Sequence, residues 1–299
     1  MYEDYYGFTE KPFSLTPDPK YLFRSESHAN AFELLRYAID RGEGFVVVTG
    51  EIGTGKTTLC RALLSEMDRK TCTALVLNPF LAEDDLLRLI LQEFGLVSKD
   101  EAGLRSAQGM SKQALVSTLN EFLLSLLPIG ARAVVIIDEA QNLPLPVLEQ
   151  IRILSNLETT KEKLLQIILV GQVNLETLLR SPELRQLDQR VSIRARLEPL
   201  NAEESAAYIG HRLTIANPTR PVAFSRKALE EVQAYSGGIP RLINLICDRA
   251  LVGAYAARSN RVEAEMVTTA ASNLQLPRLQ RASKRWFPRF GRGYSAAIT

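Results

Sequence analysis

The sequence is poor in the residues that build disulfide frameworks and metal clusters. Among its 299 residues there are three cysteines and two histidines. Cys60, Cys72 and Cys247 stand at unrelated spacings, which excludes a scaffold of paired disulfides, and no Cys and His residues have the close spacing of a structural zinc site. Unpaired cysteines are typical of proteins in a reducing compartment, so we expect a cytoplasmic setting.

Long hydrophobic runs are also missing. Nowhere does the sequence reach the ~18 consecutive apolar residues of a membrane-spanning helix. The residues that follow Met1 are charged and aromatic, unlike the basic and then apolar start of a secretory signal. We therefore expect a chain that neither spans a membrane nor enters the secretory pathway.

Net charge is low, at +2, but basic residues are concentrated at the C-terminus. Residues 274–299 contain no acid and carry Arg278, Arg281, Lys284, Arg285, Arg289 and Arg292, with Trp286 and Phe287 among them. We expect residues 276–299 to form a flexible basic tail. Such a tail suits a peripheral contact with anionic membrane lipid, although nucleic-acid contacts and solvated chain ends share its composition. We favour the membrane contact or the solvated end over nucleic acid.

A glycine-rich loop is the most informative motif that is present. Residues 50–57 read GEIGTGKT and match every fixed position of the phosphate-binding pattern GxxxxGK[ST], between an apolar run and a helical pattern. Backbone N–H groups and the helix dipole would face the phosphates, Lys56 would reach the β- and γ-phosphates, and the Thr57 hydroxyl would bind Mg²⁺. The alternative is an ordinary strand-to-helix turn. The predicted nucleotide-binding residues of this segment are Gly50, Glu51, Gly53, Thr54, Gly55, Lys56, Thr57 and Thr58.

Two acids follow a second apolar run, Ala133–Ile137. Asp138 is expected to hold the Mg²⁺ shell, directly or through water. Glu139 stands one residue further on, where it can polarise the attacking water as a general base. The alternative is that both acids only favour the N-terminus of the next helix.

A third apolar run, Gln166–Val170, ends in the polar sequence GQVN. Ligands lie at the carboxyl ends of parallel strands, so a polar side chain here is expected beside the γ-phosphate. Gln172 is our candidate to position the water or to sense the phosphate. Asn174, or a simple turn role for this segment, is the alternative.

Three arginines are candidates for contacts with the nucleotide. Arg185 and Arg190 precede the strand-like run from Val191 and could reach a nucleotide bound by a neighbouring subunit, and we favour Arg190. A surface salt bridge to Glu183 or Asp188 is the alternative for either. Arg241 follows Gly-Gly-Ile-Pro in the first turn of an expected helix, where it could contact the γ-phosphate and couple nucleotide state to the angle between domains.

The order of apolar patterns predicts an α/β fold. Strands are expected at Phe45–Thr49, Thr73–Leu77, Ala133–Ile137, Gln166–Val170 and Val191–Ala195, and helices at His28–Arg41, Ala82–Phe94 and Met110–Leu127. Alternating strands and helices indicate a parallel sheet sandwiched by helices. After Pro199 only helical patterns remain, beginning at the cap residues Asn201 and Ser225 and at Pro240.

These patterns divide the chain into four parts. Residues 1–44 are expected to form an N-terminal strap and helix that belong to the core, because Tyr and Pro residues in the first 21 suit an extended segment bound to a surface. Residues 45–198 would form the α/β nucleotide-binding core, residues 199–275 a small all-helical lid, and residues 276–299 the basic tail.

Taken together, these motifs resemble those of AAA+ ATPases, and they occur in the same order. The segments are GEIGTGKTT at 50–58, VVIIDEAQ at 134–141, LVGQ at 169–172, LRQLDQR at 184–190 and SGGIPR at 236–241. The opening YGFTEKPFSLTPDPKYLF at 6–23 is similar, more narrowly, to the ExeA/GspA group of secretion and envelope-assembly ATPases.

The resemblance implies ATP and Mg²⁺ as cofactors and a homo-oligomer as the working assembly. It implies a Walker B pair in Asp138 and Glu139, a sensor-1 residue in Gln172, an arginine finger in Arg190 and a sensor-2 arginine in Arg241. Proteins of this group often continue into a transmembrane helix and a peptidoglycan-binding domain, and this sequence contains neither.

Our leading hypothesis is an ATP-binding and ATP-hydrolysing protein that drives conformational change in a bacterial envelope-assembly, secretion or polysaccharide-export system. It would act in the cytoplasm, at the inner face of the cytoplasmic membrane, with components of that machinery as partners. A DNA-binding transposition or targeting ATPase is the alternative. A helicase would need a second motor domain, and a nucleotide-binding module without turnover would not need a base such as Glu139.

Overall fold

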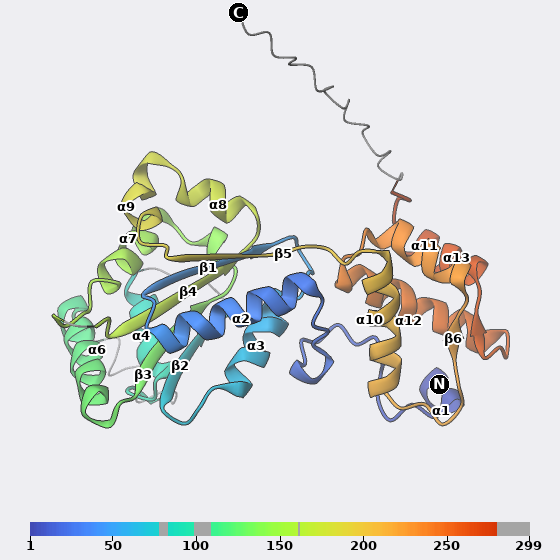
Figure 1. The fold of residues 1–299 in the computed structure, drawn as a ribbon, viewed down its shortest axis with the longest axis horizontal. Helices are drawn as coiled ribbons and strands as arrows, with labels where there is room; N and C mark the ends of the chain where they lie inside the picture. Colours follow the sequence, from blue (N-terminus) through green and yellow to red (C-terminus); the bar gives the residue numbers. More distant parts are fainter. Residues whose placement is uncertain (78–82, 99–108, 161, 280–299) are drawn as a thin grey trace, which may run out of the picture.

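A parallel five-stranded sheet with helices on both faces forms one part of the molecule, and a group of helices beyond one edge forms the other (Figure 1). The structure is a computed structural model that describes residues 1–77, 83–98, 109–160 and 162–279. The predicted fold class, a P-loop core followed by a helical lid, is confirmed.

All five predicted strands are present, with ends shifted by a few residues. They are β1 (Phe45–Gly50), β2 (Thr71–Val76), β3 (Arg132–Ile137), β4 (Leu165–Gly171) and β5 (Ile193–Leu197). They lie in the order β2-β3-β4-β1-β5, and every pairing is parallel. The carboxyl ends of β1, β3 and β4 therefore meet at one edge of the sheet, which is where the predicted phosphate loop and acids begin.

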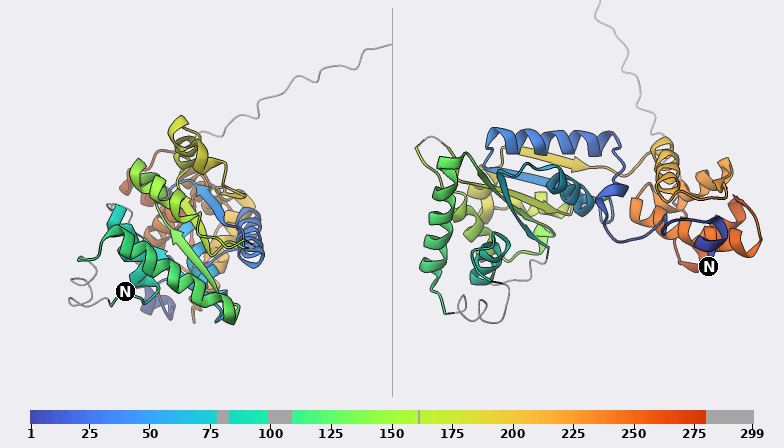
Figure 2. Two further views of the ribbon diagram at one scale, coloured as in Figure 1. Left: turned by 90° about the vertical axis from the view of Figure 1, so that its left-hand side faces the viewer. Right: turned by 90° about the horizontal axis from the view of Figure 1, so that it is seen from below.

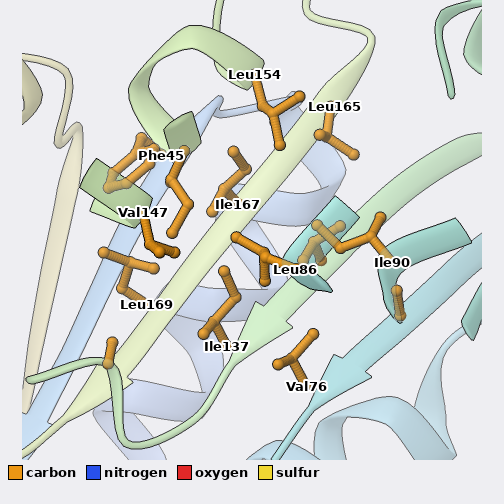
Figure 3. Packing of buried hydrophobic residues seen from close by; sticks show 14 of the residues in the cluster. Phe45, Val76, Leu86, Ile90, Ile137, Val147, Leu154, Leu165, Ile167 and Leu169 are labelled. Atoms are coloured by element: carbon orange, nitrogen blue, oxygen red, sulfur yellow. The ribbon is translucent and has the colours of Figure 1, made fainter. Parts of the chain in front are cut away.

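The central strands read as continuous apolar runs because both faces of the sheet are buried. Successive residues of β1 point to opposite faces, so Phe45 and Val47 join one hydrophobic cluster whereas Val46 and Val48 join another. Helices α2 (Glu26–Arg41) and α3 (Lys56–Glu66) cover the second face, and α4 (Glu83–Glu93), α6 (Lys112–Leu126) and α7 (Leu145–Leu154) cover the first. Figure 3 shows the first cluster, with Ile137, Ile167 and Leu169 from the sheet beside Leu86 and Val147 from helices.

Short elements connect these layers. They are the helices α8 (Asn174–Leu179) and α9 (Arg185–Asp188) and the 3-10 turns η1 (Pro19–Tyr21), η2 (Leu127–Ile129), η3 (Ala140–Asn142) and η4 (Pro182–Leu184). The predicted helix from Ala82 begins at Glu83, and Ala82 itself lies outside the described residues.

The lid begins where the sequence predicted a helix cap. Asn201 accepts a hydrogen bond from the backbone N–H of Glu204, and the Glu204 side chain accepts one from the backbone N–H of Asn201, so the two form a capping box. Four helices follow, α10 (Ala202–Ile215), α11 (Arg226–Ser236), α12 (Pro240–Ala256) and α13 (Ala264–Asn273). The lid is not wholly helical, however, because the two-residue strands β6 (Ala223–Phe224) and β7 (Arg261–Val262) pair in parallel.

The first residues pack on the lid, which departs from the expectation that residues 1–44 belong with the core. They form a short helix, α1 (Tyr2–Tyr6), that lies beside the lid helices in Figure 1 and in the right view of Figure 2. The aromatic rings of Tyr2, Tyr6, Phe8 and Phe13 are buried in the same cluster as α10 to α13. The small lid gains apolar contact area from these rings, whereas α2 packs on the sheet with Leu22 beside it.

The described part of the C-terminal segment remains attached to the lid. The backbone N–H of Leu279 donates to the Ala234 carbonyl at 2.9 Å, and Arg278 pairs with Glu231 at 2.7 Å. Our predictions for the basic and aromatic residues from Arg281 onward lie outside the described residues. Within residues 1–77, 83–98, 109–160 and 162–279, no helix has both the length and the apolarity needed to cross a bilayer.

Candidate nucleotide-binding site

The glycine-rich loop curls tightly between β1 and α3. Gly53 and Gly55 have φ values of 81° and 100°, a region that glycine occupies without steric cost. The Thr54 hydroxyl donates to the Glu51 carbonyl at 2.9 Å, and Thr54 is fully buried. The ammonium group of Lys56 closes the loop by donating to two of its carbonyls, those of Gly50 and Glu51, each at 3.0 Å.

Lys56 is nearly fully buried at the N-terminus of α3. Burial lowers its pKa below the ordinary value, and the negative charges of Glu139 and Asp138 oppose that effect. The loop carbonyls are weak partners for a buried cation. An anionic ligand at this helix N-terminus would compensate the lysine charge far better.

Asp138 and Thr57 are brought together as the sequence predicted. The Thr57 hydroxyl donates to Asp138 Oδ2 at 2.5 Å, which joins the start of α3 to the end of β3. Asp138 is only 3% exposed. Hydroxyl and carboxylate oxygens are the ligands that Mg²⁺ prefers, so these two residues fit the ion. In the part of the chain that the structure describes, no cluster of three or more His, Cys, Asp or Glu side chains could hold a metal. With only two protein ligands, Thr57 and Asp138 suit an ion that also binds substrate phosphates.

Glu139 and Gln172 are also neighbours. Glu139 follows Asp138 in a left-handed conformation with φ 53°, and its backbone N–H donates to Asp138 Oδ1 at 2.9 Å. The Nε2 atom of Gln172 lies 3.4 Å from Glu139 Oε2, across the edge between β3 and β4. Asn174, the alternative to Gln172, is exposed at the start of α8.

The three arginines are placed differently. Arg241 lines the pocket at the phosphate loop, and its backbone N–H donates to the Gly53 carbonyl at 3.1 Å. Arg190 lies away from this pocket and donates to the Ser155 hydroxyl at 2.8 Å, and Arg185 is exposed. The salt bridge to Asp188 that we considered for Arg185 and Arg190 is made by Arg194 instead, at 2.7 Å.

The pocket has a second wall that the motifs did not reveal. The phosphate loop lines the pocket on one side with Ile52 to Thr58. The other lining residues come from the strap and the lid, and they include Ser14 to Asp18, Tyr21 to Phe23, Tyr208, Arg212 and Asn244. Arg212 is buried, and it donates to the Pro12 carbonyl at 2.5 Å, the Ser14 carbonyl at 3.0 Å and the Tyr208 hydroxyl at 3.1 Å. Two of these partners, Pro12 and Ser14, lie near the other end of the sequence, so no local pattern could have revealed the contacts with the strap.

His28 also lines the pocket and supports the loop. Its Nε2 atom lies 2.8 Å from the Thr54 carbonyl, and its Nδ1 atom lies 2.7 Å from the Ser25 hydroxyl. The carbonyl can only accept, so Nε2 carries the proton. Burial lowers the pKa of His28. A histidine three residues after a helix-cap serine, shortly before a phosphate loop, was the available signal in the sequence.

Similarity to known proteins agrees with this geometry. Residues 39–179 match the family model of the AAA domain. The fold resembles the ORC2 protein of Aeropyrum pernix, with a TM-score of 0.67, 17% identity, and coverage of 89% of this chain and 72% of that chain. It also resembles Cdc6p of Pyrobaculum aerophilum, with a TM-score of 0.66, 16% identity, and coverage of 88% and 70%. At such identities these structures show the fold alone. The phosphate loop, Asp138 and Glu139 all lie within the residues that match the AAA domain.

A closer similarity is to the General secretion pathway protein A of Aeromonas hydrophila. The two sequences are 47% identical over 262 residues, which is 88% of this chain and 46% of that protein. The predicted resemblance to the ExeA/GspA group is therefore confirmed. The chain spans about half the length of this relative.

Proposed function

We propose that this protein hydrolyses ATP with Mg²⁺ and uses the cycle to turn its lid relative to its core. The convergence of Lys56, Thr57, Asp138 and Glu139 at one sheet edge carries the proposal. The domain boundaries we propose are residues 45–198 for the core and 199–275 for the lid, with α1 and the residues up to Phe13 assigned to the lid on their packing.

Each residue has a separate task in this mechanism. The N–H groups of residues 50–58 bind the phosphate oxygens, and Lys56 leaves the loop carbonyls to pair with the β- and γ-phosphates. Thr57 and Asp138 would hold Mg²⁺, which offsets charge on the phosphates. Glu139 takes a proton from the attacking water, and Gln172 orients that water beside the γ-phosphate.

The arginines extend the site beyond one core. Arg241 would bind the γ-phosphate from the lid, and its position against Gly53 supports this role. Arg190 lies outside the pocket of its own chain, as a residue that acts on a neighbouring subunit would. We therefore propose a homo-oligomer in which Arg190, or alternatively the exposed Arg185, reaches the nucleotide of the next protomer.

The relative from Aeromonas hydrophila is named for the general secretion pathway, and this supports a role in bacterial secretion or envelope assembly. Partners would be components of that machinery, and the working location would be the cytoplasm beside the inner face of the membrane. The DNA-targeting alternative predicts ATP-dependent DNA binding that weakens steeply with salt. An absence of DNA binding at low salt would remove it.

The experiment that tests the catalytic assignment compares phosphate release by wild type, Lys56→Ala and Glu139→Gln. We expect Lys56→Ala to lose ATP binding and turnover together. Glu139→Gln should bind ATP normally and hydrolyse it at least about 100-fold more slowly, because a positioned general base contributes about 10²–10⁴-fold. Wild-type rates in both variants would overturn the assignment.

A further inference from the structure

Gln141 joins the end of β3 to the end of β4. It belongs to the one-turn helix η3, two residues after Glu139. Its Oε1 atom accepts a hydrogen bond from the backbone N–H of Gln172 at 3.0 Å. Its Nε2 atom donates to Glu139 Oε2 at 2.6 Å. One side chain therefore contacts both the acid proposed as the base and the strand end proposed to face the γ-phosphate.

The partners determine the orientation of the Gln141 amide. A backbone N–H can only donate, so the amide oxygen must face residue 172 and the NH₂ group must face Glu139. Because Glu139 accepts as a carboxylate, this second bond is charge-assisted and roughly twice as strong as a neutral one. The bond from Gln172 Nε2 to the same oxygen is longer, at 3.4 Å. Gln141 is thus the principal side chain that fixes Glu139 Oε2.

The strand end leaves space for this amide and for little else. A Cβ atom at Gly171 would lie 2.7 Å from Gln141 Oε1 and 2.8 Å from Leu175 Cδ2. The left-handed backbone of Glu139 turns the chain after β3 back toward β4, which brings Gln141 to this gap. Two local features, a glycine and a left-handed acid, are therefore needed for the same contact.

We propose that Gln141 is a positioning residue for Glu139 and couples the base to the backbone of β4. This inference rests on the proposed role of Glu139. A shift of residue 172 on loss of the γ-phosphate would move the Gln141 amide and, with it, the Glu139 carboxylate. The effect on rate follows because a general base must lie within hydrogen-bond reach of the water that it deprotonates.

Two substitutions separate the two bonds. Gln141→Met keeps a side chain of similar length and removes both hydrogen bonds. Gln141→Glu can still accept from the Gln172 N–H but cannot donate to Glu139 as a carboxylate. We expect kcat to fall about 10–100-fold in each, with the KM and Kd for ATP within about twofold of wild type. Asn142→Asp is the matched control, because Asn142 is the exposed neighbouring amide and its replacement adds the same charge. It should keep the wild-type kcat.

A double variant tests the coupling itself. Residues that act as a unit are non-additive, so Gln141→Met added to Glu139→Gln should cost nothing further in kcat. A kcat within about twofold of wild type in Gln141→Glu and Gln141→Met would overturn the proposal. A weaker ATP affinity and a lower melting temperature with unchanged kcat would also overturn it, because that result indicates a purely structural role. If Gln141→Met does not fold, Gln141→Glu decides alone. A fully active Glu139→Gln would instead refute the base assignment, which is a separate result.

Discussion

The backbone N–H of Arg241 donates to the carbonyl oxygen of Gly53 at 3.1 Å. A Cβ atom on Gly53 would lie 2.6 Å from the Cβ of Arg241, so the lid helix α12 begins directly against the phosphate loop. A phosphate that reorders the loop must therefore also act on the first turn of α12. The lid is coupled to the loop by main-chain contact, in addition to any bond from the arginine side chain.

The close approach of Gly238 to Leu200 gives the first stability prediction. Gly238 has φ 80°, and an added Cβ would lie 1.8 Å from the Leu200 carbonyl oxygen. We expect Gly238→Ala to lower the free energy of unfolding by about 3 kcal/mol or more, because the backbone would be strained and displaced. Denaturant unfolding measures this. Gly210→Ala is the control: Gly210 lies in α10 with open space around it, so that variant should gain about 0.5–1 kcal/mol. Equal effects at both sites would contradict the reasoning.

Stability should fall as the solution becomes acidic, in part because of His28. Its pKa is lowered by burial, whereas an unfolded histidine titrates near about 6.5. Above that pH His28 is neutral in both the folded and the unfolded protein, so it adds no pH dependence to the free energy of unfolding. Below it the unfolded chain binds a proton that the folded chain resists, so unfolding becomes more favourable by at most about 1.4 kcal/mol per pH unit.

The measurement for His28 is the free energy of unfolding at pH 7 and pH 5. We expect His28→Gln to show a smaller loss than wild type between these values. His211 also has a pKa lowered by burial, and His211→Gln serves as the comparison. An unchanged pH dependence in His28→Gln would show that His28 does not contribute.

Arg212 should hold the N-terminal segment on the lid. Arg212→Ala removes the donors of the Pro12 and Ser14 carbonyls and of the Tyr208 hydroxyl, so we expect a loss of about 3 kcal/mol and faster proteolysis before residue 20. Arg226→Ala is the control, because the Arg226 side chain is 93% exposed and pairs with Glu230 at 3.2 Å. It should cost less than about 1 kcal/mol. A proteolysis pattern identical in both variants would contradict this role.

Mixing experiments test whether Arg190 or Arg185 acts between subunits, as we propose. We expect Arg190→Ala to bind ATP normally, to lose about 10³-fold or more in kcat, and to lower the rate of wild-type protein mixed with it. Arg185→Ala, at the exposed start of α9, should have little effect. The reverse result would transfer the role to Arg185, and full activity in both would remove this segment from the active site.

The sheet and the position of the candidate site residues at its edge were predictable because their signals are local. A strand buried on both faces is a short apolar run, as Phe45–Gly50 illustrates, and the loop residues are contiguous in sequence. The ends of β5 were misplaced by two residues, since Val191 and Ser192 continue the apolar and small-residue pattern without belonging to the strand.

Long-range contacts were not predictable in the same way. The aromatic residues of α1 clearly needed a partner surface, but only the tertiary structure shows that the lid provides it. Gln141 can contact residue 172 only because β3 and β4 are adjacent, and this adjacency depends on the strand order and not on spacing along the chain. The strands β6 and β7 contain two residues each, too few for a periodic pattern.

The packing of α1 on the lid also has a mechanical consequence. Residues up to Phe13 share a hydrophobic cluster with α10 to α13, whereas α2 to β5 form the sheet body. The backbone therefore passes between the two bodies twice, once within residues 14–25 and once within residues 198–201. Two covalent tethers oppose sliding and twisting but permit rotation about the line that joins them. In the proposed ATPase cycle, we therefore expect the lid to turn about the line that joins these two connections.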